Sequence, residues 1–322
     1  MRILTSRYKR IAHLKYGADG SRLFGFGESM SVQRQGRFVT FAGVEGWDPQ
    51  GSPEPDRGVA DCVANGGFCV LPDSGFVAAH RVADTFTSRA VAYDADGNNP
   101  LHLPVGHADL GFPIALSAKG DHLLVGNHSD PSAILRFRLP LVHPMEAAKR
   151  RPVPSATYPS TARGLAFEFP AAGDEFLSVE RHHHEVLAQW RTLADLAPVG
   201  TPLPLTSATS AVRFAVEDCR LVAIAGPSLF SYDLVRPAKP PVKKVSGVNR
   251  KHFTGIAVHP DGRRVLATCN DETVREYDAV TLQELRAYGW KVGRLRCVAI
   301  APDGLTAAAG SDTGKVVVWD LE

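Results

Sequence analysis

The chain has 322 residues, of which 44% are hydrophobic and 22% are charged. This is an ordinary globular mixture, which excludes a disordered chain and supplies enough apolar surface for a large core. Lys and Arg number 36 against 34 Asp and Glu. The overall charge therefore favours neither nucleic acid nor a membrane as a partner, and any such preference must come from local clustering.

The N-terminal segment and the cysteines bear on the compartment. Residues 1–14 (MRILTSRYKRIAHL) are too broken by charge for a signal peptide, and no later window approaches the roughly 18 apolar residues of a membrane span. The cysteines are odd in number, form no C-x-x-C pattern and mostly stand in apolar contexts, which is typical of small buried residues in a reducing compartment. We expect a cytoplasmic protein without disulfides. The cysteines are Cys62, Cys69, Cys219, Cys269 and Cys297.

Apolar segments that end on an aromatic residue recur along the whole chain, with spacings of 52, 44, 53, 42, 45 and 42 residues. Repeats of this length, each of which contains a few short predicted strands, indicate a radial β structure, because one small sheet cannot bury its face alone. The aromatic residues are Phe41, Tyr93, Phe137, Trp190, Tyr232, Tyr277 and Trp319.

A second element precedes each aromatic residue: an apolar strand, a tight turn and a strand of small residues. Pro-Asp-Gly between two apolar runs predicts a hairpin, because Pro presets φ, Asp caps the turn and Gly accepts a positive φ. The aromatic strand comes third and a weaker fourth strand follows, so each unit is predicted to be a four-stranded propeller blade. In chain order the clearest copies are LKYGADGSRLFGF (14–26), CVLPDSGFVAAH (69–80), IAVHPDGRRVLAT (256–268) and VAIAPDGLTAAAG (298–310).

The aromatic-Asp endings at 93–94, 232–233, 277–278 and 319–320, with the Pro-Asp-Gly turns, resemble the WD40-repeat family over essentially the whole chain. The resemblance implies an all-β fold: a seven-bladed β-propeller of four-stranded antiparallel blades in a single domain, 1–322. It also implies a top face that binds partner proteins. The expected blades are approximately 8–56, 57–105, 106–157, 158–200, 201–246, 247–288, and 289–322 plus 1–6.

The ends of the chain are expected to meet in one blade. Glu322 follows Trp319 by three residues, so blade seven lacks an outer strand of its own, and RILTS (2–6) is available to supply it. We therefore expect the N-terminal strand to complete the last blade and close the ring, with no appended catalytic domain.

Two stretches exceed the repeat and are rich in Pro, which central strands do not accept. We expect loops at 46–56 and 139–160. The second contains Lys149, Arg150 and Arg151. Such a trio occurs in nuclear or nucleic-acid signals, but a solvated loop is the favoured interpretation.

In a WD40-like ring, the loops that enter the first strand of each blade share the top face. Blades six, seven and one become neighbours on closure, which brings their basic loops together as one surface, the basic arc. Guanidinium groups bind carboxylate or phosphate, so the arc is suited to an acidic or phosphorylated segment. Asp271, Glu272 and Asp312 on adjacent turns offer neutralising charges. The arc consists of Arg7, Lys9, Arg10, Arg250, Lys251, His252, Trp290, Lys291 and Arg294.

No pattern for catalysis or a cofactor is evident. His182 and His184 could share one face with Glu185 or His128 nearby, but this spacing is not specific for zinc, and a solvated turn is favoured. GFGESM (25–30) lacks the phosphate-binding pattern and is predicted to lie in a strand. We therefore expect no metal, no cofactor and no enzymatic activity.

We expect a monomeric, non-catalytic scaffold or adaptor that binds partner proteins, including acidic or phosphorylated segments, on its top face. Two alternatives stay open: a propeller enzyme of the metal-dependent hydrolase or lactonase type at the central channel, and a nucleic-acid-binding protein that uses the basic arc. Convergent carboxylates or histidines in the channel would favour the first. Affinity that falls steeply with salt would favour the second.

Overall fold

The computed structural model of the chain describes residues 1–34, 37–62, 68–73, 75–81, 88–94, 96–98, 100–103, 113–117, 119–127, 133–139, 154–159, 163–170, 173–215, 219–245 and 251–321. In these residues every regular element is a β-strand, β1 to β28. No helix in this part of the chain is long and apolar enough to cross a membrane. The strands fall into two compact units, one formed by Met1–Gly58 with Thr206–Glu322, the other by Val59–Leu205.

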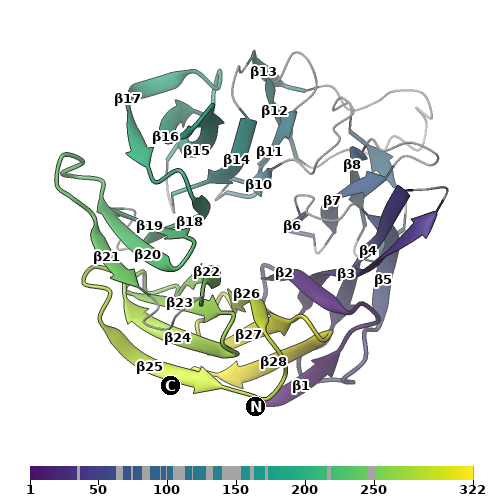
Figure 1. Cartoon of the computed structure of the whole chain (residues 1–322). Helices are drawn as coiled ribbons and strands as arrows, with labels where there is room; N and C mark the ends of the chain where they lie inside the picture. The colour runs from purple at the N-terminus through teal and green to yellow at the C-terminus, as the bar shows by residue number, and fades with distance from the viewer. Residues whose placement is uncertain are drawn as a thin grey trace. The chain divides into compact units, whose positions relative to one another are not determined.

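The first unit contains blades one, five, six and seven, each an antiparallel sheet (Figure 1). Blade one has β2 (Arg10–Tyr16), β3 (Leu23–Arg34) and β4 (Arg37–Trp47), and β5 (Arg57–Cys62) begins at the end of the unit. Blade five has β18 (Thr209–Ala215), β19 (Arg220–Ala225), β20 (Ser228–Asp233) and β21 (Val242–Val245), and blade six has β22 (Phe253–Val258), β23 (Arg264–Cys269), β24 (Thr273–Asp278) and β25 (Glu284–Gly289). Blade seven has β26 (Leu295–Ile300), β27 (Thr306–Ser311), β28 (Lys315–Asp320) and β1 (Arg2–Thr5).

The second unit contains blades two, three and four, again antiparallel. The chain is thus an all-β, seven-bladed β-propeller of four-stranded blades, as the repeat predicts. Blade two has β6 (Phe68–Val70), β7 (Phe76–Arg81), β8 (Ser88–Tyr93) and β9 (Leu101–His102); blade three has β10 (Ile114–Leu116), β11 (His122–Asn127), β12 (Ala133–Arg138) and β13 (Ala156–Pro159); blade four has β14 (Arg163–Glu168), β15 (Glu175–His182), β16 (Glu185–Thr192) and β17 (Pro198–Leu205).

The N-terminal strand is the outer strand of blade seven. β1 runs antiparallel to β28, with Arg2 opposite Val318 and Thr5 opposite Lys315 (Figure 1). Leu4 on β1 is fully buried in the apolar cluster between blades seven and one. The expected completion of the last blade by the N-terminal strand is therefore observed in the first unit.

The Pro-rich stretch at 139–160 is not wholly a loop. Ala156–Pro159 forms β13, which pairs with β12 as the fourth strand of blade three. Because β13 is the outermost strand of its sheet, Pro159 removes no hydrogen bond that a further strand would need. Lys149, Arg150 and Arg151 lie outside the described residues. In the first Pro-rich stretch, β4 continues to Trp47, so the loop starts at Asp48 rather than at residue 46.

The third strand of blade one ends on Trp47, which is fully buried, so the prediction that it ends on Phe41 was wrong. Trp47 pairs with Leu23, three residues after the turn glycine Gly20. Three aromatic residues, Phe38, Phe41 and Trp47, stand on the long strand β4, and spacing alone does not separate them. In three other blades the residue three positions after the turn glycine likewise pairs with the aromatic residue of the third strand. These pairs are Leu123–Phe137, Val265–Tyr277 and Ala307–Trp319.

In blade four the residue at the position of the aromatic side chain is charged. Phe176 stands three residues after Gly173 and pairs with Arg191, while Trp190 is one residue away and so points to the opposite face. Arg191 is buried and forms an ion pair with Glu180, with Nη2 2.8 Å from Oε1. Its guanidinium carbon lies 4.6 Å from the centre of the Tyr158 ring. A buried ion pair therefore replaces the aromatic side chain, and the assignment of Trp190 was also wrong.

The Asp that follows the aromatic residue ends the third strand. Asp278 Oδ1 accepts hydrogen bonds from the backbone N–H groups of Thr281 at 2.7 Å and Val280 at 3.0 Å. Asp48, after Trp47, likewise accepts a hydrogen bond from the N–H of Gln50 at 2.8 Å. The aromatic-Asp pair thus combines one buried ring with one turn-forming carboxylate.

The turn glycine also allows consecutive blades to approach. A Cβ atom on Gly120 would lie 2.8 Å from Cγ of Pro72, in the turn of the preceding blade. One on Gly304 would lie 2.7 Å from Nε2 of His259. Both glycines have φ near +70°, with 71° and 74°. Glycine is therefore needed for the turn and for the contact.

We predict that Trp47→Ala lowers the free energy of unfolding by about 3–5 kcal/mol, because the side chain is fully buried and its Nε1–H donates to the Thr5 carbonyl at 3.1 Å. Trp190→Ala should cost clearly less, because Trp190 is only half-buried. Urea unfolding followed by tryptophan fluorescence and circular dichroism measures both. Equal losses would contradict the assignment of Trp47 as the repeat residue.

We predict a pH-dependent effect for Asp278→Asn. The N–H groups of Thr281 and Val280 hold the pKa of Asp278 below its usual value, although burial acts in the opposite direction. A lowered folded-state pKa stabilises the fold above the unfolded pKa of about 3.9, and this contribution is lost as the pH falls through the folded value.

The stability difference between wild type and Asp278→Asn should therefore be present at pH 7 and shrink below about pH 4. Urea unfolding at a series of pH values measures it. Asp320→Asn is the matched control, because Asp320 follows Trp319 but is exposed and makes no such bonds within the described residues. A difference that is constant with pH would contradict the role of the carboxylate.

Candidate partner-binding surface

The described residues of the basic arc all lie in the first unit, in segments that lead into the first strands of their blades. Arg7, Lys9 and Arg10 lie between β1 and the start of β2. Lys251 and His252 directly precede β22, and 290–294 joins β25 to β26. Arg250 lies outside the described residues. The predicted loop positions therefore share one end of their strands.

Blades six, seven and one are neighbours through their first strands, β22, β26 and β2 (Figure 1). Thr254 Oγ1 on β22 donates to the Leu295 carbonyl on β26 at 2.9 Å. Cys297 Sγ on β26 lies 3.5 Å from the Ile11 carbonyl oxygen on β2. The three basic loops consequently belong to consecutive blades of one unit.

One turn of blade seven contacts two of the basic loops. The Gly314 carbonyl accepts a hydrogen bond from the Ser6 N–H at 2.8 Å. Thr313 Oγ1 donates to the Val292 carbonyl at 2.5 Å. Residues 312–314 therefore connect the loop that carries Arg7 to the loop that carries Lys291.

Two arginines of the arc are bound to buried carboxylates. Glu45 is 2% exposed, and its Oε1 lies 3.0 Å from Nε of Arg7; its Oε2 accepts the Ser6 hydroxyl at 2.5 Å. Glu28 is 1% exposed and pairs with Arg10. A buried carboxylate needs such a cation. The Arg7 and Arg10 side chains remain 65% and 42% exposed, so each is held at its inner edge and reaches solvent at its outer edge.

The neutralising acids differ from those that the sequence suggested. Asp271 pairs with Arg275 at 3.0 Å, and Asp312 lies 3.6 Å from Arg296, neither of which belongs to the arc. Loop positions did not predict Glu28 and Glu45, because both stand inside apolar strands. An acidic residue within an apolar strand is the sequence signal that indicates such a buried partner. The Asp312 side chain instead accepts the backbone N–H of Arg294 at 3.0 Å and so holds the loop.

Arg296 is a further basic residue beside the arc that loop positions did not predict. It stands at a β-bulge of β26, between Leu295 and Cys297. Burial and the Arg296 guanidinium lower the pKa of Arg10, while Asp312 raises it. The two guanidinium groups on neighbouring strands are therefore close enough to interact, and each has its own carboxylate partner, Glu28 for Arg10 and Asp312 for Arg296.

Trp290 contributes mainly to packing. It is half-buried, its ring centre lies 4.7 Å from that of Trp319, and it stacks on Tyr288 at 6.0 Å with an angle of 13° between the rings. Lys291 and Arg294, in contrast, are exposed. The cationic side chains rather than the indole therefore form most of the available surface.

The histidine run forms the turn between β15 and β16 of blade four. His183 has φ +52°, and His182 Nε2 lies 3.6 Å from Oε2 of Glu180, the carboxylate that also pairs with Arg191. Within the described residues, no group of three or more His, Cys, Asp and Glu side chains is placed to hold a metal ion. Of the cysteines, Cys219 is exposed, contrary to the expectation of burial.

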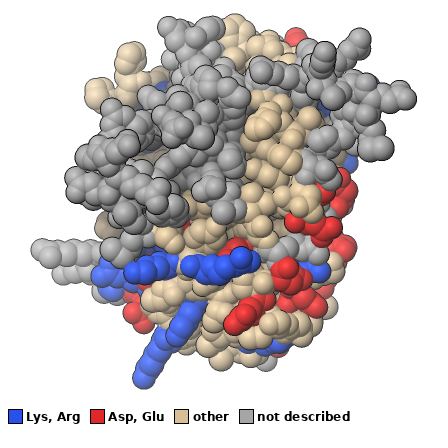
Figure 2. Space-filling model, turned by 90° about the vertical axis from the view of Figure 1, so that its right-hand side faces the viewer, with Lys and Arg blue, Asp and Glu red and all other residues tan. Residues whose placement is uncertain are grey.

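Figure 2 shows one side of the molecule, where Lys and Arg side chains form a band and Asp and Glu side chains lie beside it. Basic and acidic groups thus lie next to one another in the described part of this face, which agrees with the near-balanced composition. Local gathering of charge, rather than net charge, must therefore provide any electrostatic preference.

Two consecutive segments, 242–278 and 281–320, match the family model of the WD domain, G-beta repeat. Each segment begins before or at the outer strand of one blade and ends on the third strand of the next. The chain is therefore a seven-bladed β-propeller that carries WD40 repeats, a fold typical of protein-interaction scaffolds.

A stretch of 67 residues is 31% identical to the serine-threonine kinase receptor-associated protein of Gallus gallus, and equally to that of Bos taurus. The alignment covers 21% of this chain and 19% of each relative. The chain thus matches about a fifth of the length of these relatives, and the similarity concerns a part of the propeller.

We predict that Gly314→Ala destabilises the fold more than Gly200→Ala. Both glycines have positive φ, 75° and 67°, so each substitution costs about 1–2 kcal/mol of backbone strain. A Cβ on Gly314 would also lie 2.2 Å from the Tyr8 carbonyl oxygen, whereas nothing lies within 4 Å of one on Gly200. Urea unfolding measures both; equal losses would show that the turn does not hold the loop of Arg7.

Proposed function

We propose that this chain is a non-catalytic scaffold that binds partner proteins through acidic or phosphorylated segments on the basic arc, and that it acts as a cytoplasmic monomer. One observation carries the proposal: three basic loops from consecutive blades lie at the same end of their first strands, and two of their arginines are anchored on buried carboxylates. Anchoring reduces the entropy that these side chains lose when a partner binds.

The chemistry of the arc suits an extended anionic segment. A guanidinium has several N–H donors in one plane, so an arginine that uses its inner donors on a buried glutamate keeps outer donors for a carboxylate or phosphate. Arg7 and Arg10 have this arrangement, and Lys291 and Arg294 add charge from the next blade. The similar proteins of Gallus gallus and Bos taurus are named for association with a receptor, which agrees with a binding role.

The test is affinity capture of the tagged chain from its source cells, with partners identified by mass spectrometry. The variant is Lys291→Glu with Arg294→Glu, because both side chains are exposed. Arg7 and Arg10 are left unchanged, since their replacement would leave Glu45 and Glu28 buried without a cation and destabilise the fold. We expect the variant to lose partners that the wild type captures.

Lys239→Glu with Arg263→Glu is the matched control, because both residues are exposed in the same unit and the change in charge is identical. It should capture the wild-type partners, and thermal unfolding should show that all three proteins are folded. Unchanged capture by the Lys291/Arg294 variant would contradict the proposal. Partners removed by nuclease, with affinity that falls steeply with salt, would point to nucleic acid instead.

A further inference from the structure

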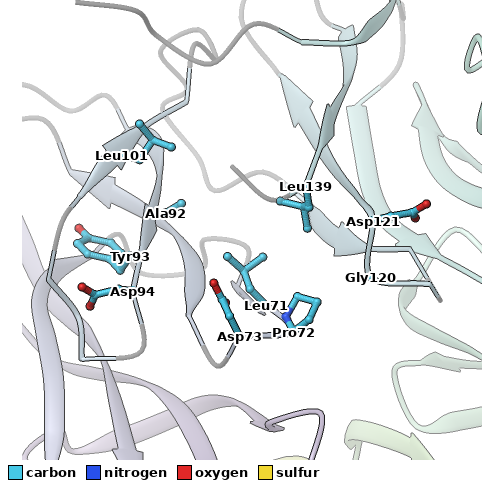
Figure 3. A pocket seen from close by; sticks show the side chains of 10 residues that line it. All are labelled: Leu71, Pro72, Asp73, Ala92, Tyr93, Asp94, Leu101, Gly120, Asp121 and Leu139. Atoms are coloured by element: carbon cyan, nitrogen blue, oxygen red, sulfur yellow. The ribbon is translucent and has the colours of Figure 1, made fainter. Parts of the chain in front are cut away.

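The second unit contains a cavity of about 340 Å³ between blades two and three. It lies beside the turns that join the first and second strands of both blades (Figure 3). Its position differs from that of the basic arc, which belongs to the other unit. The described lining residues are Leu71, Pro72, Asp73, Ala92, Tyr93, Asp94, Leu101, Gly120, Asp121 and Leu139.

The walls of the cavity are apolar and well supported. Leu71 is buried in the core cluster between the two blades, and Leu101 and Leu139 pack against that cluster. The Tyr93 ring is buried and stacks on Phe76, with ring centres 5.1 Å apart. Since these walls are part of the core, the cavity is preformed for an apolar group.

The described charged groups that line the cavity are all carboxylates. Asp73 points toward the space bordered by Tyr93 and Leu139 (Figure 3). Its Oδ1 accepts the Gly75 N–H at 3.0 Å, which fixes the side chain on its turn. Asp94 and Asp121 lie at the edges.

The basic residues described near the cavity already have acidic partners. Lys119, next to Gly120, pairs with Asp174 at 3.2 Å. Asp121 Oδ1 lies 2.9 Å from Nδ1 of His122 and accepts the Ser117 hydroxyl at 2.8 Å. Asp73 is itself exposed, so its carboxylate lies at the solvent side of the apolar walls. Within the described residues, no lysine or arginine lines the cavity to neutralise it.

We propose that this cavity binds a basic side chain, arginine or lysine, of a partner peptide. The hydrocarbon stem of such a side chain matches the leucine and tyrosine walls, and its cationic head matches the carboxylate of Asp73. An apolar side chain would leave the carboxylate without a counter-charge in a less polar setting, and an acidic one would be repelled. The cavity and the basic arc therefore select partner segments of opposite charge, and each site is testable without the other.

The test is a titration of the full chain, with ¹³C-labelled leucine methyl groups, followed by NMR. The probe is acetyl-Ala-Arg-Ala-amide, and the neutral comparison is the same peptide with citrulline in place of arginine. The arginine peptide should shift the methyl signals of Leu71, Leu101 and Leu139 in a saturable way, and the citrulline peptide should bind about tenfold or more weakly.

Asp73→Asn should weaken binding of the arginine peptide by about tenfold or more, because the charge is removed while the amide oxygen can still accept the Gly75 N–H. Asp303→Asn is the matched control: Asp303 follows Pro302 as Asp73 follows Pro72, and its Oδ1 accepts the Leu305 N–H at 2.9 Å. This variant should bind like the wild type.

Three outcomes would overturn the proposal. The first is the absence of saturable shifts at the three leucines. The second is equal binding of the arginine and citrulline peptides, which would indicate an apolar site without charge selection. The third is tighter binding by the variant Lys149→Ala, Arg150→Ala, Arg151→Ala, which would assign the cavity to this chain's own basic segment rather than to a partner.

Discussion

Burial of blade faces against neighbouring blades of the same unit is the constraint on which this structure depends. The apolar clusters do not belong to single sheets: Leu14 and Trp47 of blade one pack with Ala299 of blade seven, and Ile224 of blade five packs with Ile256 of blade six. A four-stranded sheet with two apolar faces is not stable alone, so a blade needs a neighbour to pack against. The alanine-rich second strands and the turn glycines follow from this requirement, because only small groups allow such close approach.

The same constraint leaves the ends of the blades for function. Loops at the strand ends pack less than the faces do, and they carry the basic arc in one unit and the Asp73 cavity in the other. The arc is nevertheless tied to the core, because Arg7 and Arg10 are partners of the buried Glu45 and Glu28. Surface charge and core stability are therefore coupled in blade one, which separates these two arginines from the exposed Lys291 and Arg294.

Much of the fold was predictable because the period of the repeat is a one-dimensional property. The number of blades, the Pro-Asp-Gly hairpins and the pairing of β1 with β28 all follow from strand patterns and their spacing. Errors arose where two candidates stood close together. Phe41 and Trp47 lie on the same strand, and Trp190 and Arg191 are adjacent, so the choice depended on the cross-strand partner. β13 was missed because its proline is acceptable only at an outer edge.

The basic arc, like the fold, was predictable from the sequence only in part. The sequence by itself determined which loops are basic and, through the blade order, which of them are neighbours. Only the tertiary structure decided that Glu28 and Glu45 bind two of the arginines, that Asp271 and Asp312 pair with residues outside the arc, and that Trp290 stacks on Trp319. The reason is physical: a repeat records the spacing of strands along the chain, whereas a side-chain ion pair depends on which individual residues face one another once the strands have paired.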